Sequence, residues 1–434
     1  MTGHYDAIVI GAGIIGSAVG LELSRKGWKT LNIDKLPAAG YGSTSASCAI
    51  IRTHYSTLDG TAFSYEGYFY WKDWQAHLGT EDERGLALFN SCGCLIMKTD
   101  ANDHLKSVLE HQRTVGIPFE EWDTETIKVK MPHMNLNTYG PPKRPGDEGF
   151  CEPTDGTIKG AVFFPCAGYI SDPQLATHNI QQAAEAAGGR FLFNAEIVEI
   201  RKNRNGCVTG VTLKGGKEID APVVVNVAGP HSHKINEMAG ALADMNISTK
   251  ALKQEVTHLP MPTENWDEIG VVTSDNDIAC YTRPEKGNFL LIGSEDPECD
   301  PLEFVDPDNF DENFTEQWTI QAMRTAQRIP ALGIPSRTKG VAALYDASDD
   351  WIPIYDKSLV PGFYMACGSS GNQFKNASPA GAMMAELIEK VEAGHDHDAE
   401  PLEFHMKFTN RTIDVGFYSR RRKINSNSSF SVLG

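Results

Sequence analysis

The beginning of the chain alternates between short apolar runs and stretches with helical spacing. Residues 5–10, YDAIVI, form the kind of apolar run that a buried parallel strand requires, and apolar side chains then recur with the period of a helix over residues 14–23. Gly27 is expected to end that helix. A second apolar run over residues 29–34 finishes on Asp34. The pattern predicts strand, glycine-rich turn, helix and strand, which is a βαβ unit.

Two later stretches predict the same kinds of element, a buried strand or a capped helix. A helix is expected after residue 171, with Asp172 as its N-cap and Pro173 at its first position. Residues 362–368, GFYMACG, predict a buried strand that runs into a glycine loop. Ser378 and Pro379 then predict the start of a second capped helix.

The rest of the pattern differs and predicts a second domain. Residues 239–340 alternate short strands, such as NFLLIG, with loops rich in proline and aspartate, which is more typical of an antiparallel sheet. We therefore expect an α/β fold in which a Rossmann-like domain is interleaved with an antiparallel-sheet domain. The expected boundaries are 1–88, 148–238 and 338–396 for the first domain, 89–147 and 239–337 for the second, and 397–434 for a C-terminal extension.

Composition and charge narrow the possible partners. The 434 residues are 41% hydrophobic and 22% charged, which is typical of a folded globular chain. The net charge of −18 repels nucleic acids and anionic lipid surfaces, so neither is an expected partner. The only basic run, residues 420–423, is interpreted as a solvated tail segment.

The cysteines and the apolar N-terminal stretch indicate a cytoplasmic protein. Nine cysteines are scattered without the spacing of a disulfide framework or a zinc site, so reduced thiols and no metal are expected. The apolar stretch over residues 7–23 follows Asp6 without a preceding basic residue, and Glu22 interrupts it. Neither an export signal nor a membrane span is therefore expected.

The predicted turn of the βαβ unit has the spacing G-x-G-x-x-G. Its first glycine allows a tight turn, its second allows close approach of a pyrophosphate, and its third allows the helix to pack on the strand. Asp34 at the end of the second strand is suited to accept hydrogen bonds from ribose hydroxyls and repels the 2′-phosphate of NADP. A glycine-studded turn without a ligand is the simpler alternative. The residues of this turn are Gly11, Ala12, Gly13, Ile14, Ile15 and Gly16.

Four ordered segments give the chain a family resemblance. They are AAGYGSTSASCAIIR at 38–52, AEIVEIRKN at 195–203, VVVNVAGPHS at 223–232 and MACGSSGNQFKNASPAG at 365–381. Together with the glycine turn, they resemble the D-amino-acid oxidase and sarcosine oxidase superfamily of FAD-dependent amine oxidoreductases over most of residues 5–395. The resemblance favours FAD over NAD, because a nicotinamide enzyme needs neither the hydroxyl-rich segment nor the late glycine loop.

The resemblance also implies which residues form the site. Arg52 and Lys375 would hold a substrate carboxylate, Tyr345 and the weaker candidate Tyr281 would line the pocket, and ordinary surface cations or packed core tyrosines are the alternatives. Besides the glycine turn, the implied FAD contacts are Asp34, Lys35, Ser43, Thr44, Ser45, Ser47, Val198, Ala228, Gly229, Gly368, Gly371, Asn372, Gln373, Phe374 and Lys375.

Three departures from the family pattern modify these expectations. Ala343 stands where relatives carry a cysteine that binds flavin covalently, and GSTSASCA lacks the histidine of other relatives, so FAD is expected to be non-covalent. Leu291 replaces a lysine that promotes reaction with oxygen, which leaves oxidase and dehydrogenase activity both open. Asn372 replaces the family's histidine in the late loop.

The expected activity is oxidation of the C–N bond of a secondary or N-methylated amino acid, with hydride transfer to the flavin and hydrolysis of the imine. The electron acceptor would be oxygen or another redox partner. A D-amino acid or glycine oxidase or dehydrogenase is the alternative of the same class. An NAD-dependent dehydrogenase and a non-catalytic flavin-binding protein are the alternatives of other classes.

Overall fold

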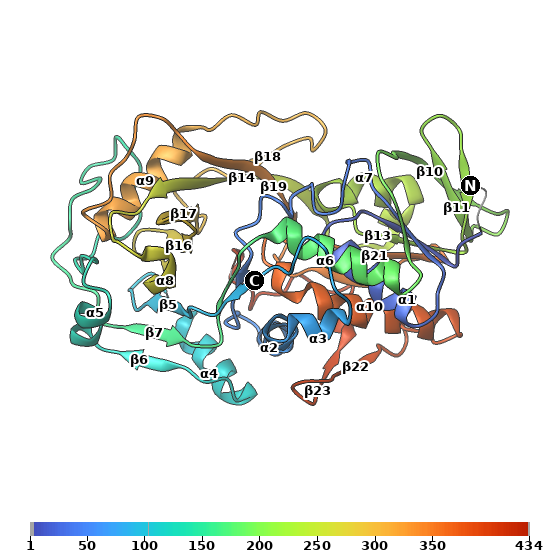
Figure 1. The fold of residues 1–434 in the computed structure, drawn as a ribbon, viewed down its shortest axis with the longest axis horizontal. Helices are drawn as coiled ribbons and strands as arrows, with labels where there is room; N and C mark the ends of the chain where they lie inside the picture. The colour runs from blue at the N-terminus through green and yellow to red at the C-terminus, as the bar shows by residue number, and fades with distance from the viewer. Residues whose placement is uncertain (1–3, 103, 433–434) are drawn as a thin grey trace.

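The protein has two parts, each built on one large β-sheet (Figure 1). The computed structural model describes residues 4–102 and 104–432. The first part carries a six-stranded sheet with the order β20-β21-β13-β1-β2-β9, and the second carries a nine-stranded sheet. The strands of the first sheet are β1 (Ala7–Ile10), β2 (Thr30–Ile33), β9 (Arg190–Leu192), β13 (Val223–Asn226), β20 (Ile354–Lys357) and β21 (Phe363–Cys367). The expected combination of a Rossmann-like and a mainly antiparallel part is confirmed.

The predicted βαβ unit lies at the centre of the first sheet. Strand β1 pairs in parallel with β2 on one side and with β13 on the other, and all its residues are buried. Helix α1 (Ile14–Arg25) contacts both α6 (Pro173–Ala186) and α10 (Ala377–Glu392), as Figure 1 shows. Gly381 permits this close packing, because a Cβ there would lie 2.7 Å from the backbone of Ala18.

The two predicted helix starts have different outcomes. Asp172 caps α6 as expected, since its side chain accepts a hydrogen bond from the Leu175 amide. The expected start of α10 at Ser378 is wrong, because the helix begins at Ala377 with Asn376 as its N-cap. A 3-10 turn over Phe374–Asn376 leads directly into α10 and thereby places Ser378 inside its first turn.

The nine-stranded sheet separates a hydrophobic core from a face that carries polar residues. Leu95, Leu290 and Ile292 point into a core with Trp318 of α9 (Glu316–Arg328). Most strand pairs are antiparallel, whereas β15 pairs with β5 in parallel. The strands are β5 (Cys94–Met97), β6 (Glu120–Trp122), β7 (Ala161–Phe164), β14 (Thr249–Pro260), β15 (Val272–Asp275), β16 (Cys280–Glu285), β17 (Phe289–Ser294), β18 (Glu303–Phe304) and β19 (Gly340–Ser348).

Strands β7 and β19 belong to the nine-stranded sheet, although the expected boundaries assign their residues to the first domain.

Of the described helices, none is long and apolar enough to cross a membrane. The other helices are α2 (Leu58–Lys72), α3 (Trp74–Leu78), α4 (Leu105–Val115), α5 (Thr124–Lys130), α7 (Ser232–Ala239) and α8 (Trp266–Ile269). The other strands are β3 (Ile50–Ile51), β4 (Phe89–Asn90), β8 (Gly168–Ile170), β10 (Ile197–Lys202), β11 (Val208–Leu213), β12 (Glu218–Asp220), β22 (Glu403–Met406) and β23 (Arg411–Asp414).

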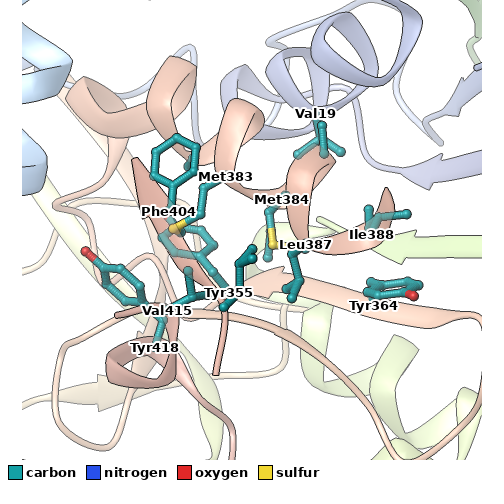
Figure 2. Close-up of a cluster of buried hydrophobic side chains, with 14 of the residues drawn as sticks. Val19, Tyr355, Tyr364, Met383, Met384, Leu387, Ile388, Phe404, Val415 and Tyr418 are labelled. Atoms are coloured by element: carbon teal, nitrogen blue, oxygen red, sulfur yellow. The ribbon is translucent and has the colours of Figure 1, made fainter. Parts of the chain in front are cut away.

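The C-terminal extension completes the core of the first part. Figure 2 shows Phe404, Val415 and Tyr418 packed with Met383 of α10 and Tyr355 of β20. All five side chains are buried. Residues after α10 therefore contribute apolar surface to the same core as the βαβ unit.

The interpretation of residues 420–423 as a solvated segment is wrong for Arg420. Its side chain is 0% exposed and forms ion pairs with Asp244 at 2.6 Å, Asp356 at 3.0 Å and Asp398 at 2.9 Å. The Arg422 side chain is 8% exposed and pairs with Asp350 at 2.8 Å. Since a guanidinium offers five donors in a fixed plane, Arg420 joins three separate segments at once.

Replacing Arg420 with methionine is expected to destabilise the protein by about 3–5 kcal/mol, because buried Asp356 would lose its guanidinium partner. Urea unfolding of the FAD-loaded protein measures the effect. Arg421→Met is the matched control, because that neighbouring side chain is 47% exposed and its ion pairs are screened by water. Equal shifts of the unfolding midpoint in the two variants would contradict the structural role of Arg420.

Candidate functional site

The predicted glycine turn connects β1 to α1. Gly11 has φ +112°, and a Cβ at this position would lie 2.3 Å from the Val227 carbonyl oxygen, so the turn requires glycine. The first turn of α1 holds no acidic residue, and Gly13 gives it no side-chain cap. Its Ile14 amide donates to the Thr44 hydroxyl at 3.2 Å. Amide groups and a positive helix end without a carboxylate are suited to phosphate groups.

Asp34 lies beside this turn, as expected. Its two carboxylate oxygens accept hydrogen bonds from the amides of Ala12 at 2.7 Å and Leu36 at 2.9 Å. Each oxygen keeps a lone pair for a ribose hydroxyl. The Ala195 amide donates to the Asp34 carbonyl, which brings the segment before Val198 to the same edge. Lys35 is instead engaged in an ion pair with Asp308 at 2.7 Å.

The turn after β13 and the hydroxyl-rich segment enclose the glycine turn. The Val227 amide donates to the Ile10 carbonyl at 2.9 Å, which places Ala228 and Gly229 beside the turn. The Ser43 hydroxyl donates to the Leu344 carbonyl of β19 at 2.7 Å and so links the two parts. The hydroxyls of Ser45 and Ser47 bond to their own segment, at the Gly42 carbonyl and the Ala49 amide respectively.

The late glycine loop lies against Tyr345. Gly371 has φ +68°, and a Cβ there would lie 2.3 Å from the Tyr345 ring. The Gly368 amide donates to the buried Asp346 carboxyl at 2.6 Å. Further contacts fix the loop: Asn372 Nδ2 donates to the Trp351 carbonyl, Gln373 Nε2 donates to Asn372 Oδ1, and Phe374 stacks on Trp71.

Arg52 and Lys375, which are far apart in the sequence, contact the same tyrosine. The Arg52 guanidinium lies 4.3 Å and the Lys375 ammonium 5.2 Å from the ring centroid of Tyr55. Lys375 Nζ also donates to the Asn372 carbonyl at 2.7 Å and to the Tyr55 hydroxyl at 3.0 Å. Both cations are buried, at 7% and 3% exposure. Among the described residues, no carboxylate pairs with either side chain.

This arrangement suits an anionic ligand. Burial and the charge of Arg52 hold the pKa of Lys375 well below its usual range. A carboxylate bound between the two groups would remove their mutual repulsion and supply the missing counter-charge. The predicted clamp residues are therefore brought together, and Tyr55 is an additional site residue that no sequence signal indicated.

The end of the C-terminal extension reaches Arg52. Its guanidinium donates to the backbone carbonyls of His54 and Val432. The Ser429 amide donates to the Ser56 hydroxyl at 3.2 Å, which ties the extension to the same segment. Val432 also packs in a cluster beside Tyr345. The extension therefore forms one wall of the site.

Tyr281 lies on the polar face of the nine-stranded sheet. It pairs with Ser274 of β15 and Gly293 of β17, so these three residues share one face. The side chains of Tyr281 and Tyr345 interact, and the Cys48 thiol lies 3.7 Å from the Tyr281 hydroxyl. Burial raises the pKa of both tyrosines, so both phenols stay protonated at neutral pH.

A cleft of about 240 Å³ opens between this face and the hydroxyl-rich segment. Its lining includes Ser47, Cys48, Arg283, Leu291 and Val341. Leu291, which the family resemblance aligns with a lysine, lines this cleft together with residues of the hydroxyl-rich segment. The site lies between the loops of the first part and the polar face of the second.

A mainly parallel sheet with this turn, combined with a second sheet that covers the site, is typical of dinucleotide-binding enzymes. Residues 6–387 match the family described as FAD dependent oxidoreductase (DAO). The chain belongs to this family and is an FAD-dependent oxidoreductase. The uncapped start of α1, the three turn glycines and Asp34 fit FAD.

Known proteins resemble the chain over half of its length or more. The glycine oxidase of Geobacillus kaustophilus is 23% identical over 404 residues, which cover 91% of this chain and 96% of that protein. The N-methyl-L-tryptophan oxidase of Yersinia pestis is 28% identical over 227 residues, which cover 52% and 53%. The structure of L-proline dehydrogenase from P. horikoshii superposes with a TM-score of 0.77 at 22% identity, covering 97% and 98% of the two chains.

Proposed function

We propose that this enzyme oxidises the C–N bond of an amino acid whose amine is secondary or N-methylated. The observation that carries the proposal is the pair of buried cations, Arg52 and Lys375, which share Tyr55 and have no carboxylate partner among the described residues. Similarity to an N-methyl amino acid oxidase and to a proline dehydrogenase supports a secondary amine.

The side chains of the site would bind and orient the substrate. The fork of Arg52 suits a bidentate carboxylate contact, and Lys375 adds a second charge from the late loop. The Tyr281–Tyr345 pair would confine the rest of the substrate near this loop, since orientation is a large part of such catalysis. FAD supplies the acceptor for the substrate's hydride. Non-covalent binding is supported by Ala343, which offers no nucleophile on β19.

An anaerobic screen of N-methyl amino acids, proline analogues, glycine and D-amino acids tests the proposal. Bleaching of the flavin absorbance identifies a substrate, and formaldehyde indicates that an N-methyl group was removed. Reoxidation by air or by an artificial acceptor then distinguishes an oxidase from a dehydrogenase. If no amino acid bleaches the flavin, the proposed function is wrong and a flavin-binding role without amine turnover remains.

Deamination of glycine or a D-amino acid is the second candidate. The near-complete coverage of a glycine oxidase favours it. The same screen separates the two candidates, because deamination releases ammonia and no formaldehyde.

A further inference from the structure

A buried carboxyl group on the sheet forms no ion pair with any cation that the structure describes. Glu295 follows β17 directly and is 7% exposed. Its Oε1 accepts a hydrogen bond from the Ser274 hydroxyl at 2.6 Å, whereas Oε2 is buried without a hydrogen-bond partner among the described residues. The nearby carboxylates of Asp275 and Asp277 both pair with Arg328, at 2.6 and 3.0 Å. Glu295 thus has no evident role in holding the sheet together.

The strand register places Glu295 at the candidate site. Gly293 lies against the Tyr281 ring, and Glu295 stands two residues further on the same side of the chain. Its hydrogen bond to Ser274, the cross-strand partner of Tyr281, confirms that it shares this face. The Cys94 thiol of β5 lies within electrostatic reach of Glu295, Arg52 and Lys375 together.

Arg52 and Lys375 are suited to the carboxylate of an amino acid, and Glu295 is suited to its ammonium group. Arg52 and Lys375 come from the first part and attract a carboxylate, but both repel an ammonium group. Glu295 comes from the sheet and offers a free oxygen to a positively charged amine. A substrate whose carboxylate lies on the two cations would be oriented by this third contact.

We propose that Glu295 binds the substrate's amino group and takes up its proton before the C–H bond breaks. This inference rests on the proposed function. In this step the N–H bond of the ammonium breaks, its electron pair stays on nitrogen, and the proton forms an O–H bond with Oε2 of Glu295. The step requires no oxidant, and it leaves the neutral amine that hydride loss needs.

The surroundings of Glu295 suit proton exchange near neutral pH. Burial raises the pKa of Glu295 to about 8, the Ser274 hydrogen bond and Arg52 act to lower it, and Asp275 acts to raise it. The thiol of Cys94 on β5 shares this face and stays protonated because burial raises its pKa, whereas Cys280 on β16 packs in the core on the other side of the sheet. A carboxyl group with such a pKa can exchange a proton with an amine in this range.

Glu295→Gln tests the inference, because the amide keeps an oxygen that can accept the Ser274 hydrogen bond. Glu121→Gln is the control: Glu121 lies on β6 at the edge of the same sheet, pairs with Lys98 at 2.6 Å, and does not line the cleft. The probes are the amino acid that bleaches the wild-type flavin and the same carboxylic acid without its amino group. Their dissociation constants are measured anaerobically from changes in the flavin spectrum.

Glu295→Gln is expected to weaken binding of the amino acid at least tenfold and to leave binding of the amine-free acid within twofold. Flavin reduction should slow at least a hundredfold and lose its pH-dependent rise near pH 8. Ser274→Ala should move that rise to higher pH, because it removes a hydrogen bond that stabilises the charged carboxylate. The control variant should match the wild type in all three measurements.

Two results would overturn the inference: equal weakening of both probes in Glu295→Gln, or an unchanged pH profile in Ser274→Ala. The second variant also decides the matter if Glu295→Gln does not retain FAD. Failure of the proposed function is recognised separately, because it appears in the wild type as an absence of any amino acid that bleaches the flavin.

Discussion

Arg52→Met is expected to abolish rapid flavin reduction by the amino acid substrate while the protein keeps its FAD. Among the described residues at the proposed carboxylate position, the guanidinium is the group that can form a bidentate contact, and its loss should cost about 3 kcal/mol, roughly a hundredfold in substrate affinity. Anaerobic stopped-flow measurement of flavin bleaching against substrate concentration gives both the affinity and the limiting rate.

Arg52→Lys is the informative companion variant. It keeps the charge but not the planar fork, so it should recover part of the affinity without restoring the wild-type rate. Unchanged substrate affinity in Arg52→Met would show that the carboxylate binds elsewhere. Loss of FAD from both variants would instead assign Arg52 a role in holding the fold, together with its contact to Val432.

Lys375→Met is expected to slow flavin reduction about tenfold to a hundredfold, because the proposed clamp loses one of its two carboxylate-binding groups. The same substitution should change how stability depends on pH. Burial and Arg52 lower the pKa of Lys375 in the folded protein, so between that pKa and about 10.4 the unfolded chain binds one more proton. Stability contributed by this residue therefore rises with pH across that window.

The difference in unfolding free energy between wild type and Lys375→Met measures this effect. As the pH rises through the window, the unfolding free energy of the wild type should increase relative to that of Lys375→Met by up to about 1.4 kcal/mol per pH unit. Urea unfolding of both FAD-loaded proteins at several pH values between 6 and 10 gives the slope. A difference that stays constant over this range would mean that Lys375 remains charged in the folded protein.

The sequence predicted those parts of the fold that depend on local chemistry. The glycine turn was identifiable because Gly11, Gly13 and Gly16 follow an apolar strand and open a helix. Asp172 was recognisable as an N-cap because an aspartate precedes a proline at a helix start. Arg52 and Lys375 came from a family resemblance, and the structure supplied what the motif lacked, namely their common contact with Tyr55.

Features that depend on distant contacts were not accessible from the sequence. Ser378 has the local chemistry of a cap, but the preceding loop already turns into the helix. Arg420 belongs to a basic run, and only the folded chain shows three aspartates around it. Tertiary packing that no local pattern encodes likewise brings Val432 to Arg52 and buries Oε2 of Glu295 without a hydrogen-bond partner among the described residues.

The order of the strands also determines when the protein can capture its cofactor during synthesis. The glycine turn leaves the ribosome first, but the strands β13 and β21 that complete the sheet beside it come much later. The core beneath α10 closes only with Tyr418 of the extension. A nascent chain therefore leaves the core beneath α10 incomplete until the segment around Tyr418 has been synthesised.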